Sequence, residues 1–288
     1  MSVEKLQQKI RKIKNPTVID FTVPVKKLPA FLIEEEGTVV AAYGRFCREI
    51  LNVLKGVVPA VRFSYGYFSL LGIEGIQLFY QILSEATALG FYVFVDCVEF
   101  YTRAISEYAG EVYGNLPVDA FILSEYSGAD ALEPYLQLVK DCEKSLFVHI
   151  RSANKSAAQL QDLMTGSRLV HMAAADIVKR TGERYIGKFG YAQIAGVAAA
   201  NAPDSLRTLR GKYPKMFLLV DGYDYSNANA KYCSYAFDQL GHGAIVCASG
   251  SVLCAWEDMQ FEERDFAASA VSAAERMKKN ITKYITVL

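Results

Sequence analysis

Reactive side chains gather where one apolar segment of this sequence ends. In the stretch FYVFVDCVEFYT, residues 91 to 102, a predicted buried strand runs directly into Asp96, Cys97 and Glu99. Carboxylates at such a position can polarise a substrate, transfer a proton or bind a cation. Two neighbouring acids disfavour the thiolate form of Cys97, which makes it a poor nucleophile. The acids are therefore the first candidates for chemistry.

Polar residues also follow the other predicted strands, and reactive groups of a barrel enzyme project from these ends. The catalytic candidates are Asp96 and Arg62. The ligand-pocket candidates are Thr22, Glu99, Glu125, Tyr126, Arg151, Ser152, Asn154, Asp221, Gly222, Ser249 and Gly250. Strand ends meet water in any barrel, so each single residue is explained equally well as an ordinary solvated side chain. Together they predict a pocket for a small polar ligand.

A metal site is one interpretation of the acids at these strand ends. Hard oxygen ligands for Mg²⁺ or Ca²⁺ could come from Asp96, Glu99, Glu125 and Asp221. We favour the alternative, in which these acids are solvated or pair with Arg62 and Arg151. No CxxC pair occurs, and the three histidines have no helical i, i+4 partner, so no zinc motif follows. We predict neither a metal nor a cofactor.

The loops after the seventh and eighth predicted strands, DGYDYSNA and ASGSV, are where many barrels bind phosphate. The charges of Asp221 and Asp224 would repel a phosphate, so phosphate binding is disfavoured on electrostatic grounds. Several tyrosines near the strand ends either fill the mouth of the barrel or stack on an aromatic ligand, and the sequence leaves both interpretations open. These tyrosines are Tyr65, Tyr67, Tyr101, Tyr126 and Tyr223.

Eight short β-rich runs alternate with amphipathic segments, and this order is typical of a parallel sheet covered by helices. The predicted strands are 17–21, 59–63, 91–96, 119–123, 145–150, 192–197, 216–221 and 243–248. Eight strands with helical connections favour an α/β fold of the (β/α)₈ TIM-barrel type, as one domain over residues 1–288. Residues 1–14 predict an N-terminal helix that caps the bottom of the barrel. Residues 156–190 predict a long crossing segment with a helix and a flexible loop.

Composition narrows the function classes. The chain has 288 residues, of which 52% are apolar and 22% charged, as expected for a soluble globular protein. Lys plus Arg and Asp plus Glu both number 31, so no net field attracts nucleic acid or an anionic membrane. The charged N-terminus lacks a signal-peptide pattern, and no run is long enough to span a bilayer, which predicts a cytoplasmic protein. The six cysteines lie mostly in apolar segments, as reduced core thiols do.

Longer motifs resemble a known family over roughly residues 15 to 256. They are KNPTVIDFTVPVKKLP, YGRFCREILNVLKGVVPAVRF, DAFILSEYSGADALEPYL, FVHIRSANKSAAQLQDL, GYAQIAGVAAANAPDSLRTLRGKYP and AFDQLGHGAIVCASGSVLCAW. In this order the chain resembles orotidine 5'-phosphate decarboxylase, in particular the longer bacterial subgroup. The resemblance implies a TIM barrel, a lyase that converts orotidine 5'-phosphate (OMP) to UMP in pyrimidine biosynthesis, and a homodimer.

The resemblance also implies a catalytic array that this sequence does not keep. The family uses a Lys at the end of the second strand and a D-x-K-x-x-D motif after the third. Arg62 stands at the first Lys position, and Asp96 matches the first Asp. Val98 replaces the proton-donating Lys, and Tyr101 replaces the second Asp. Loss of a general acid alone removes ~10²- to 10⁴-fold in rate.

Ligand positions of the family are altered as well. Thr22 stands where an Asp holds the ribose, Ala153 where a Ser reads the pyrimidine, and Gly250 where an Arg grips the phosphate. We therefore favour a diverged, decarboxylase-inactive member of the family, or a small-ligand-binding barrel, whose partner is a small molecule of the nucleotide or pyrimidine class. The alternative is an active orotidine 5'-phosphate decarboxylase with a rebuilt site, in which Asp96 keeps its role and Arg62 replaces a lysine.

Overall fold

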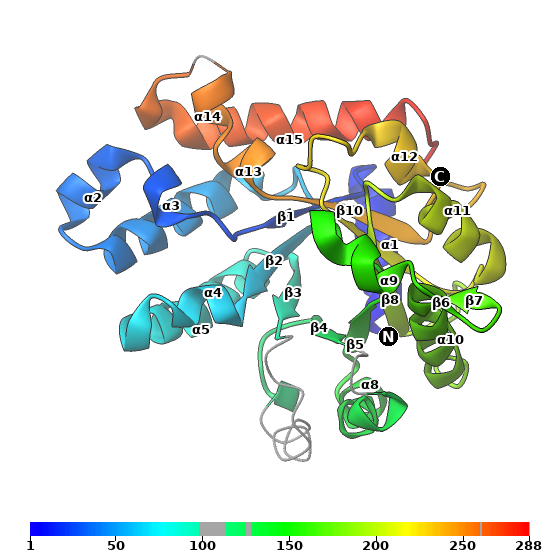
Figure 1. Cartoon of the computed structure of the whole chain (residues 1–288). Helices are drawn as coiled ribbons and strands as arrows, with labels where there is room; N and C mark the ends of the chain where they lie inside the picture. Colours follow the sequence, from blue (N-terminus) through cyan, green and yellow to red (C-terminus); the bar gives the residue numbers. More distant parts are fainter. Residues whose placement is uncertain (98–112, 125–127, 260, 288) are drawn as a thin grey trace.

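Eight short parallel strands close into a barrel in the computed structural model, which describes all residues except 98–112, 125–127, 260 and 288 (Figure 1). Going round the barrel, the strand order is β1-β10-β9-β8-β5-β4-β3-β2. The strands are β1 (Thr17–Asp20), β2 (Ala60–Ser64), β3 (Tyr92–Asp96), β4 (Ala120–Ser124), β5 (Ser145–His149), β8 (Ile194–Ala199), β9 (Leu218–Asp221) and β10 (Ala244–Ala248). The predicted (β/α)₈ fold is confirmed, and each predicted strand overlaps an observed one.

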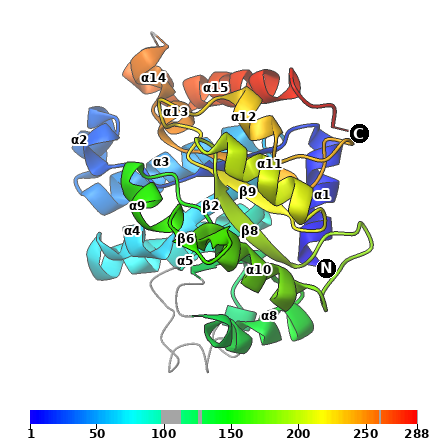
Figure 2. The ribbon, with the colours of Figure 1, turned by 45° about the vertical axis from the view of Figure 1, so that its right-hand side comes forward.

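Helices surround the strands on the outside of the barrel (Figures 1 and 2). They include α2 (Ala30–Glu36), α3 (Val39–Leu54), α4 (Tyr65–Ser69), α5 (Gly72–Ala88), α8 (Leu136–Asp141), α11 (Pro203–Lys212), α12 (Ala230–Ser234), α13 (Gly250–Leu253), α14 (Ala255–Asp258) and α15 (Phe266–Thr282). Local sequence sets their ends. The Thr38 hydroxyl caps α3 by accepting from the Ala41 N–H at 3.2 Å, and Pro203 begins α11 where a missing N–H costs nothing.

Aromatic rings fill the lower interior of the barrel. Phe147 packs edge-on against Phe94 at 5.0 Å between ring centroids and against Phe217 at 6.1 Å. Tyr92 packs on Phe94 at 4.9 Å. These rings make the lower barrel a packed core rather than a pore, as barrels of this size require. Any chemistry must therefore take place above them, at the carboxyl ends of the strands.

The N-terminal helix α1 (Ser2–Ile13) closes the bottom of the barrel, as predicted. Leu6 and Ile10 are fully buried and belong to the same apolar cluster as the interior rings. The Ser2 hydroxyl bonds the Tyr92 hydroxyl at 2.7 Å, and Lys5 Nζ pairs with Asp119 at 2.5 Å. The bottom of the barrel is sealed by these contacts, which leaves the opposite end for function.

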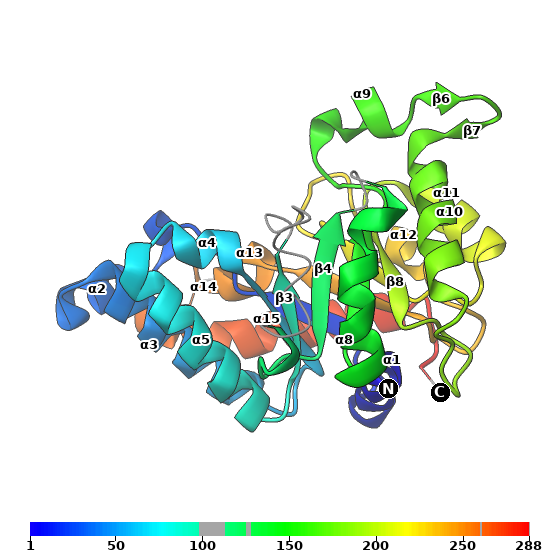
Figure 3. The same ribbon diagram turned by 90° about the horizontal axis from the view of Figure 1, so that it is seen from below.

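The crossing segment 156–190 contains more regular structure than the sequence predicted. Helix α10 (Val170–Gly182) accounts for the expected helix. In place of a flexible loop, the chain forms the short helix α9 (Ala158–Gln161) and a hairpin of β6 (Met164–Thr165) and β7 (Arg168–Leu169). Figure 3 shows α9 and this hairpin extending beyond the barrel at one end. Strands of two residues are too short to leave a periodic signal in the sequence.

The sequence also predicted reduced core cysteines and no membrane-spanning segment. All six cysteines are free, and all but Cys142 are buried, which confirms core thiols. Across the part of the chain that the structure describes, none of the helices combines the length and the apolar character needed to cross a membrane.

Removing the side chain of Leu6 should open the bottom of the barrel. Leu6→Ala deletes a fully buried side chain from the interior cluster, so we expect the free energy of unfolding to fall by ~2–5 kcal/mol in chemical denaturation. Leu160→Ala is the matched control, because Leu160 is 46% exposed and its loss should change stability little. Equal effects of the two substitutions would show that α1 does not seal the barrel.

Candidate functional site

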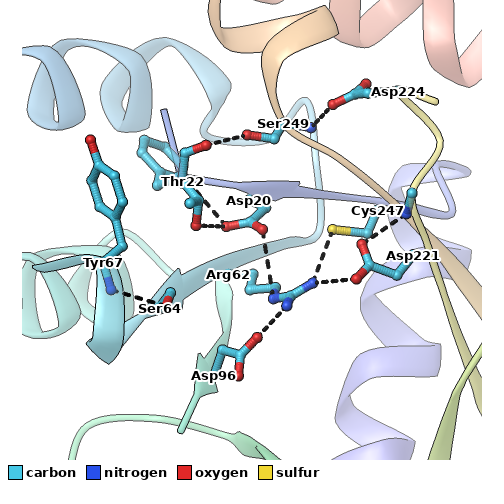
Figure 4. Close-up of polar contacts among 12 residues, drawn as sticks. Asp20, Thr22, Arg62, Ser64, Tyr67, Asp96, Asp221, Asp224, Cys247 and Ser249 are labelled. Carbon is cyan, nitrogen blue, oxygen red and sulfur yellow. Dashed lines mark hydrogen bonds and ion pairs between the residues drawn. The ribbon is translucent and has the colours of Figure 1, made fainter. Parts of the chain in front are cut away.

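A layer of polar side chains lies inside the upper end of the barrel. Alternate residues of a strand face the same side, so each strand that points an apolar residue inward points its next-but-one residue inward as well. Asp96 lies two residues after the inward-facing Phe94. In the same way, His149 follows Phe147, and Cys247 follows Ile245. We use the name polar layer for Asp20, Arg62, Asp96, His149, Asp221 and Cys247. Figure 4 shows all of them except His149 converging on one point.

The guanidinium of Arg62 is the centre of the polar layer. Its Nη2 atom donates to the carboxylate of Asp96, and its Nη1 atom donates to Asp221 Oδ2 at 3.1 Å (Figure 4). Its Nε atom lies 3.7 Å from Asp20 Oδ2, and Cys247 Sγ lies 3.9 Å from Nη1. Burial lowers the pKa of Arg62, but the carboxylates of Asp221, Asp20 and Asp96 together raise it well above its ordinary value. Arg62 is therefore a permanent cation.

Burial and the charge of Arg62 shift the pKa values of Asp20 and Asp221 in opposite directions. Burial raises the pKa of Asp20 to about 6, although Arg62 and the hydrogen bond from Thr22 lower it. For Asp221, burial also raises the pKa, but Arg62 and His149 outweigh it and bring the value below the ordinary range. Burial lowers the pKa of His149, so the imidazole is neutral at physiological pH. Among the described residues, Asp20, Asp96 and Asp221 share one guanidinium, and the ionisation of Asp20 above about pH 6 adds negative charge to this group.

A chain of hydrogen bonds links the polar layer to the rim of the barrel. The Thr22 hydroxyl donates to Asp20 Oδ1 at 2.7 Å, and the Ser249 hydroxyl donates to the Thr22 carbonyl at 2.9 Å. Asp224 then accepts from the Ser249 N–H at 2.7 Å and from the Ser251 hydroxyl (Figure 4). A carboxylate of the chain itself thus occupies the turn between β10 and α13.

Gly222 is required at its position in the loop after β9. Its φ of +80° suits glycine, and an added Cβ would lie 2.3 Å from the Cβ of Ala153. Its N–H donates to Asp221 Oδ1 at 2.8 Å, which fixes the carboxylate that holds Arg62. Gly250 is different, because an added Cβ there would meet nothing within 4 Å.

Three predicted pocket residues belong to a separate set of contacts. Arg151 binds Asp162 through two hydrogen bonds, Nε to Oδ1 at 2.9 Å and Nη2 to Oδ2 at 3.0 Å. Ser152 bonds Gln161 through its N–H at 2.8 Å and its hydroxyl at 3.0 Å. Asn154 precedes a 3₁₀ turn (Lys155–Ala157). The sequence predicted that acids at the strand ends pair with Arg62 and Arg151. This is confirmed for Arg62 with Asp96 and Asp221, and Arg151 pairs with Asp162 instead.

Part of the predicted site lies outside the described residues, namely Val98, Glu99, Tyr101, Glu125 and Tyr126. Among the residues that are described, no group of three or more His, Cys, Asp or Glu side chains is arranged to hold a metal ion. Asp96 and Asp221, two of the acids considered as metal ligands, instead bind Arg62. Of the tyrosines near the mouth, Tyr67 donates from its hydroxyl to the Val23 carbonyl and packs on Tyr43 at 5.4 Å.

Sequence reasoning missed three members of the polar layer: Asp20, His149 and Cys247. Asp20 falls inside a predicted strand, and the site residue predicted there is Thr22, two residues later. The sequence indicates no zinc-ligand role for His149 and predicts a core thiol at Cys247. Counting in steps of two from the apolar inward-facing residues Val18, Phe147 and Ile245 would have found all three.

Relatives and solved structures to which the chain is similar carry the name orotidine 5'-phosphate decarboxylase or OMP decarboxylase. No family model matches the chain. A curated orotidine 5'-phosphate decarboxylase from Rhodopirellula baltica is 28% identical over 236 residues, covering 79% of this chain and 78% of the relative. One from Clostridium perfringens is 27% identical over 243 residues, covering 83% and 84%. The solved structure of Leishmania donovani OMP decarboxylase superposes with a TM-score of 0.73 at 20% identity, covering 99% of this chain and 98% of that one.

The stability of the protein should fall as Asp20 ionises. Asp20 has a raised pKa in the folded state, so its favourable contribution is complete below about pH 4 and is lost as the pH rises through about 6. Asp20→Asn keeps the acceptor for Thr22 and removes the titration. We expect the variant to be more stable than the wild type above pH 7, by at most about 3 kcal/mol, with the difference vanishing near pH 4.

Urea denaturation at several pH values measures this difference. Asp204→Asn is the control, because Asp204 is 93% exposed and should leave the pH dependence unchanged. A variant that is less stable than the wild type above pH 7 would show that Arg62 compensates the burial of Asp20 in full.

Proposed function

The chain belongs to the orotidine 5'-phosphate decarboxylase family, and from that premise we propose that it no longer decarboxylates OMP and instead binds a small polar molecule without a phosphate. The observation that carries this proposal is the balance of charge at the mouth. Among the described residues, the carboxylates of Asp20, Asp96 and Asp221 surround one guanidinium, that of Arg62, and a fourth carboxylate, that of Asp224, lies at the rim. OMP carries a carboxylate and a phosphate, and both would meet this excess of negative charge.

The rim of the barrel supports the exclusion of phosphate. In the family, an arginine after the last strand grips the phosphate, and Gly250 stands at that position. Asp224 already takes the Ser249 N–H and the Ser251 hydroxyl, donors that an anion at this turn would need. Two like unit charges at ~4 Å repel by about 4 kcal/mol at an effective dielectric constant near 20, and a phosphate dianion would meet more.

Proton transfer is the second obstacle to decarboxylation. The carbanion left by loss of CO₂ must be protonated, and the position of the family's donor lysine is Val98. Arg62 is the cation that the described part of the mouth offers, but its pKa is raised well above the ordinary value by three acids. A guanidinium so stabilised does not release its proton, so the described residues offer no donor to an active enzyme with Arg62 in place of a lysine.

A ligand that suits this mouth is neutral or cationic. His149 Nδ1 is buried and has no hydrogen-bond partner among the described residues, and burial keeps the ring neutral. A neutral imidazole offers one donor and one acceptor to a ligand. Within the predicted nucleotide or pyrimidine class, a free pyrimidine fits this charge better than a nucleotide does. A homodimer and a cytoplasmic location stay predictions from the resemblance and the sequence.

Nucleotide binding and turnover test the proposal directly. We expect no heat of binding in calorimetry with UMP or with BMP, the inhibitor bound in the solved Methanocaldococcus jannaschii enzyme. We also expect no loss of the ultraviolet absorbance of OMP at high protein concentration. The Clostridium perfringens relative serves as the positive control. Micromolar or tighter binding of either nucleotide, or decarboxylation of OMP, would refute the proposal.

A variant that restores the phosphate site should gain nucleotide binding. Gly250→Arg places a cation where the family has one, and the space around Gly250 accepts a side chain. Combined with Asp224→Asn, which removes the competing charge, it should strengthen the binding of UMP at least tenfold, a change of ~1.4 kcal/mol.

Asp224→Asn alone is the matched control for this double variant, since it removes the charge but adds no cation. Calorimetry with UMP compares the two with the wild type. If the double variant binds no better than the wild type, then charge at the rim is not what excludes the nucleotide.

A further inference from the structure

A serine, a histidine and an aspartate form a continuous chain of contacts beside the barrel mouth. The Ser205 hydroxyl lies 3.2 Å from His171 Nε2, and His171 Nδ1 lies 3.2 Å from Asp162 Oδ1. The three residues come from the start of α11, the start of α10 and the residue after α9. Figure 3 shows these three helices on the same side of the barrel. The polar layer uses none of them.

The surrounding contacts fix which nitrogen of His171 carries the proton. Nδ1 lies 2.9 Å from the carbonyl oxygen of Gln161, which can only accept a hydrogen bond. Nδ1 therefore carries the hydrogen and donates to Gln161 and Asp162, which leaves the lone pair of Nε2 facing the Ser205 hydroxyl. This tautomer is the one that a general base needs.

The aspartate and the histidine are both held in place. Two hydrogen bonds from Arg151 hold the Asp162 carboxylate beside the imidazole. His171 is 2% exposed, which shields the ring from water and limits its rotation. Arg151, predicted as a ligand-pocket residue, thus acts through Asp162 as a positioning residue.

Ser205 is partly exposed and lies at a helix start that has no side-chain cap. It lies in the first turn of α11, a helix of ten residues whose N-cap, Ala202, offers no side-chain acceptor. The first N–H groups of a helix have no acceptor within the helix. In an uncapped first turn they can donate to an oxyanion that forms next to the hydroxyl. The site also follows the carboxyl ends of β5 and β8, the face of a barrel where reactive groups project.

We propose that Ser205, His171 and Asp162 form a second site on this barrel, a nucleophile, a general base and an orienting acid that cleave carboxylic esters. The Ser205 oxygen attacks the ester carbonyl carbon, and its proton passes to His171 Nε2. The carbon–oxygen bond to the alcohol then breaks, and the alcohol leaves with that proton. A water molecule, deprotonated by the same nitrogen, releases the acid from Ser205 and restores the site.

Labelling with an alkyl fluorophosphonate tests the nucleophile on the unmodified chain. The Ser205 oxygen displaces fluoride at phosphorus, so we expect one adduct per chain by intact mass, mapped by peptide sequencing to Ser205. A burst of p-nitrophenolate from p-nitrophenyl acetate, stoichiometric with protein, should accompany it. No adduct, or an adduct at another residue, would overturn the proposal.

Variants separate the proposed chemistry from a structural hydrogen bond. Ser205→Ala should abolish the adduct and the burst, and His171→Gln should slow labelling by ~10²-fold or more. Ser272→Ala is the matched control, a helical serine whose hydroxyl donates to the Ala268 carbonyl, and it should react like the wild type. Circular dichroism checks that each variant is folded. If a folded His171→Gln protein labels as fast as the wild type, the histidine is no general base.

Discussion

One arginine shared among three acids is the interaction on which the mouth of this barrel depends. Taking a guanidinium out of water costs several kcal/mol, and the side chain of Arg62 is only 8% exposed. Asp20, Asp96 and Asp221 compensate that cost from three other strands, β1, β3 and β9. Removing Arg62 would leave three carboxylates buried without a cation, whereas removing one acid leaves two carboxylates beside the guanidinium. The cluster therefore ties strands that are not all neighbours into one electrostatic unit.

The cluster of Arg62 and its three acids also bears on which ligands our proposal allows at the mouth. A ligand carboxylate that sought Arg62 would have to displace an acid that already binds it, and three acids surround the guanidinium. At the rim, Asp224 holds the Ser249 N–H and the Ser251 hydroxyl. Anion-binding groups are thus present in this fold but are satisfied by the chain itself. The barrel scaffold of the family is kept, and on our proposal its mouth no longer suits an anionic nucleotide.

The fold and part of the candidate site could be predicted from the sequence. The eight strands were predictable because each is an apolar run bounded by turn residues, and Arg62, Asp96 and Asp221 because they stand at strand ends. Asp20 and His149 were not found, although a two-residue periodicity from Val18 and Phe147 marks both as facing inward. The hairpin of Met164–Thr165 and Arg168–Leu169 was too short to predict. The chain from Ser205 through His171 to Asp162 is a tertiary arrangement, which no local pattern encodes.

A crystal structure of the protein grown with a high concentration of BMP shows directly whether the mouth of the barrel excludes a nucleotide. We expect Arg62 in contact with Asp20, Asp96 and Asp221, Asp224 bound to the Ser249 N–H, and no nucleotide density at the mouth. Density for the nucleotide, with its phosphate on the Ser249 turn and Asp224 displaced, would contradict it.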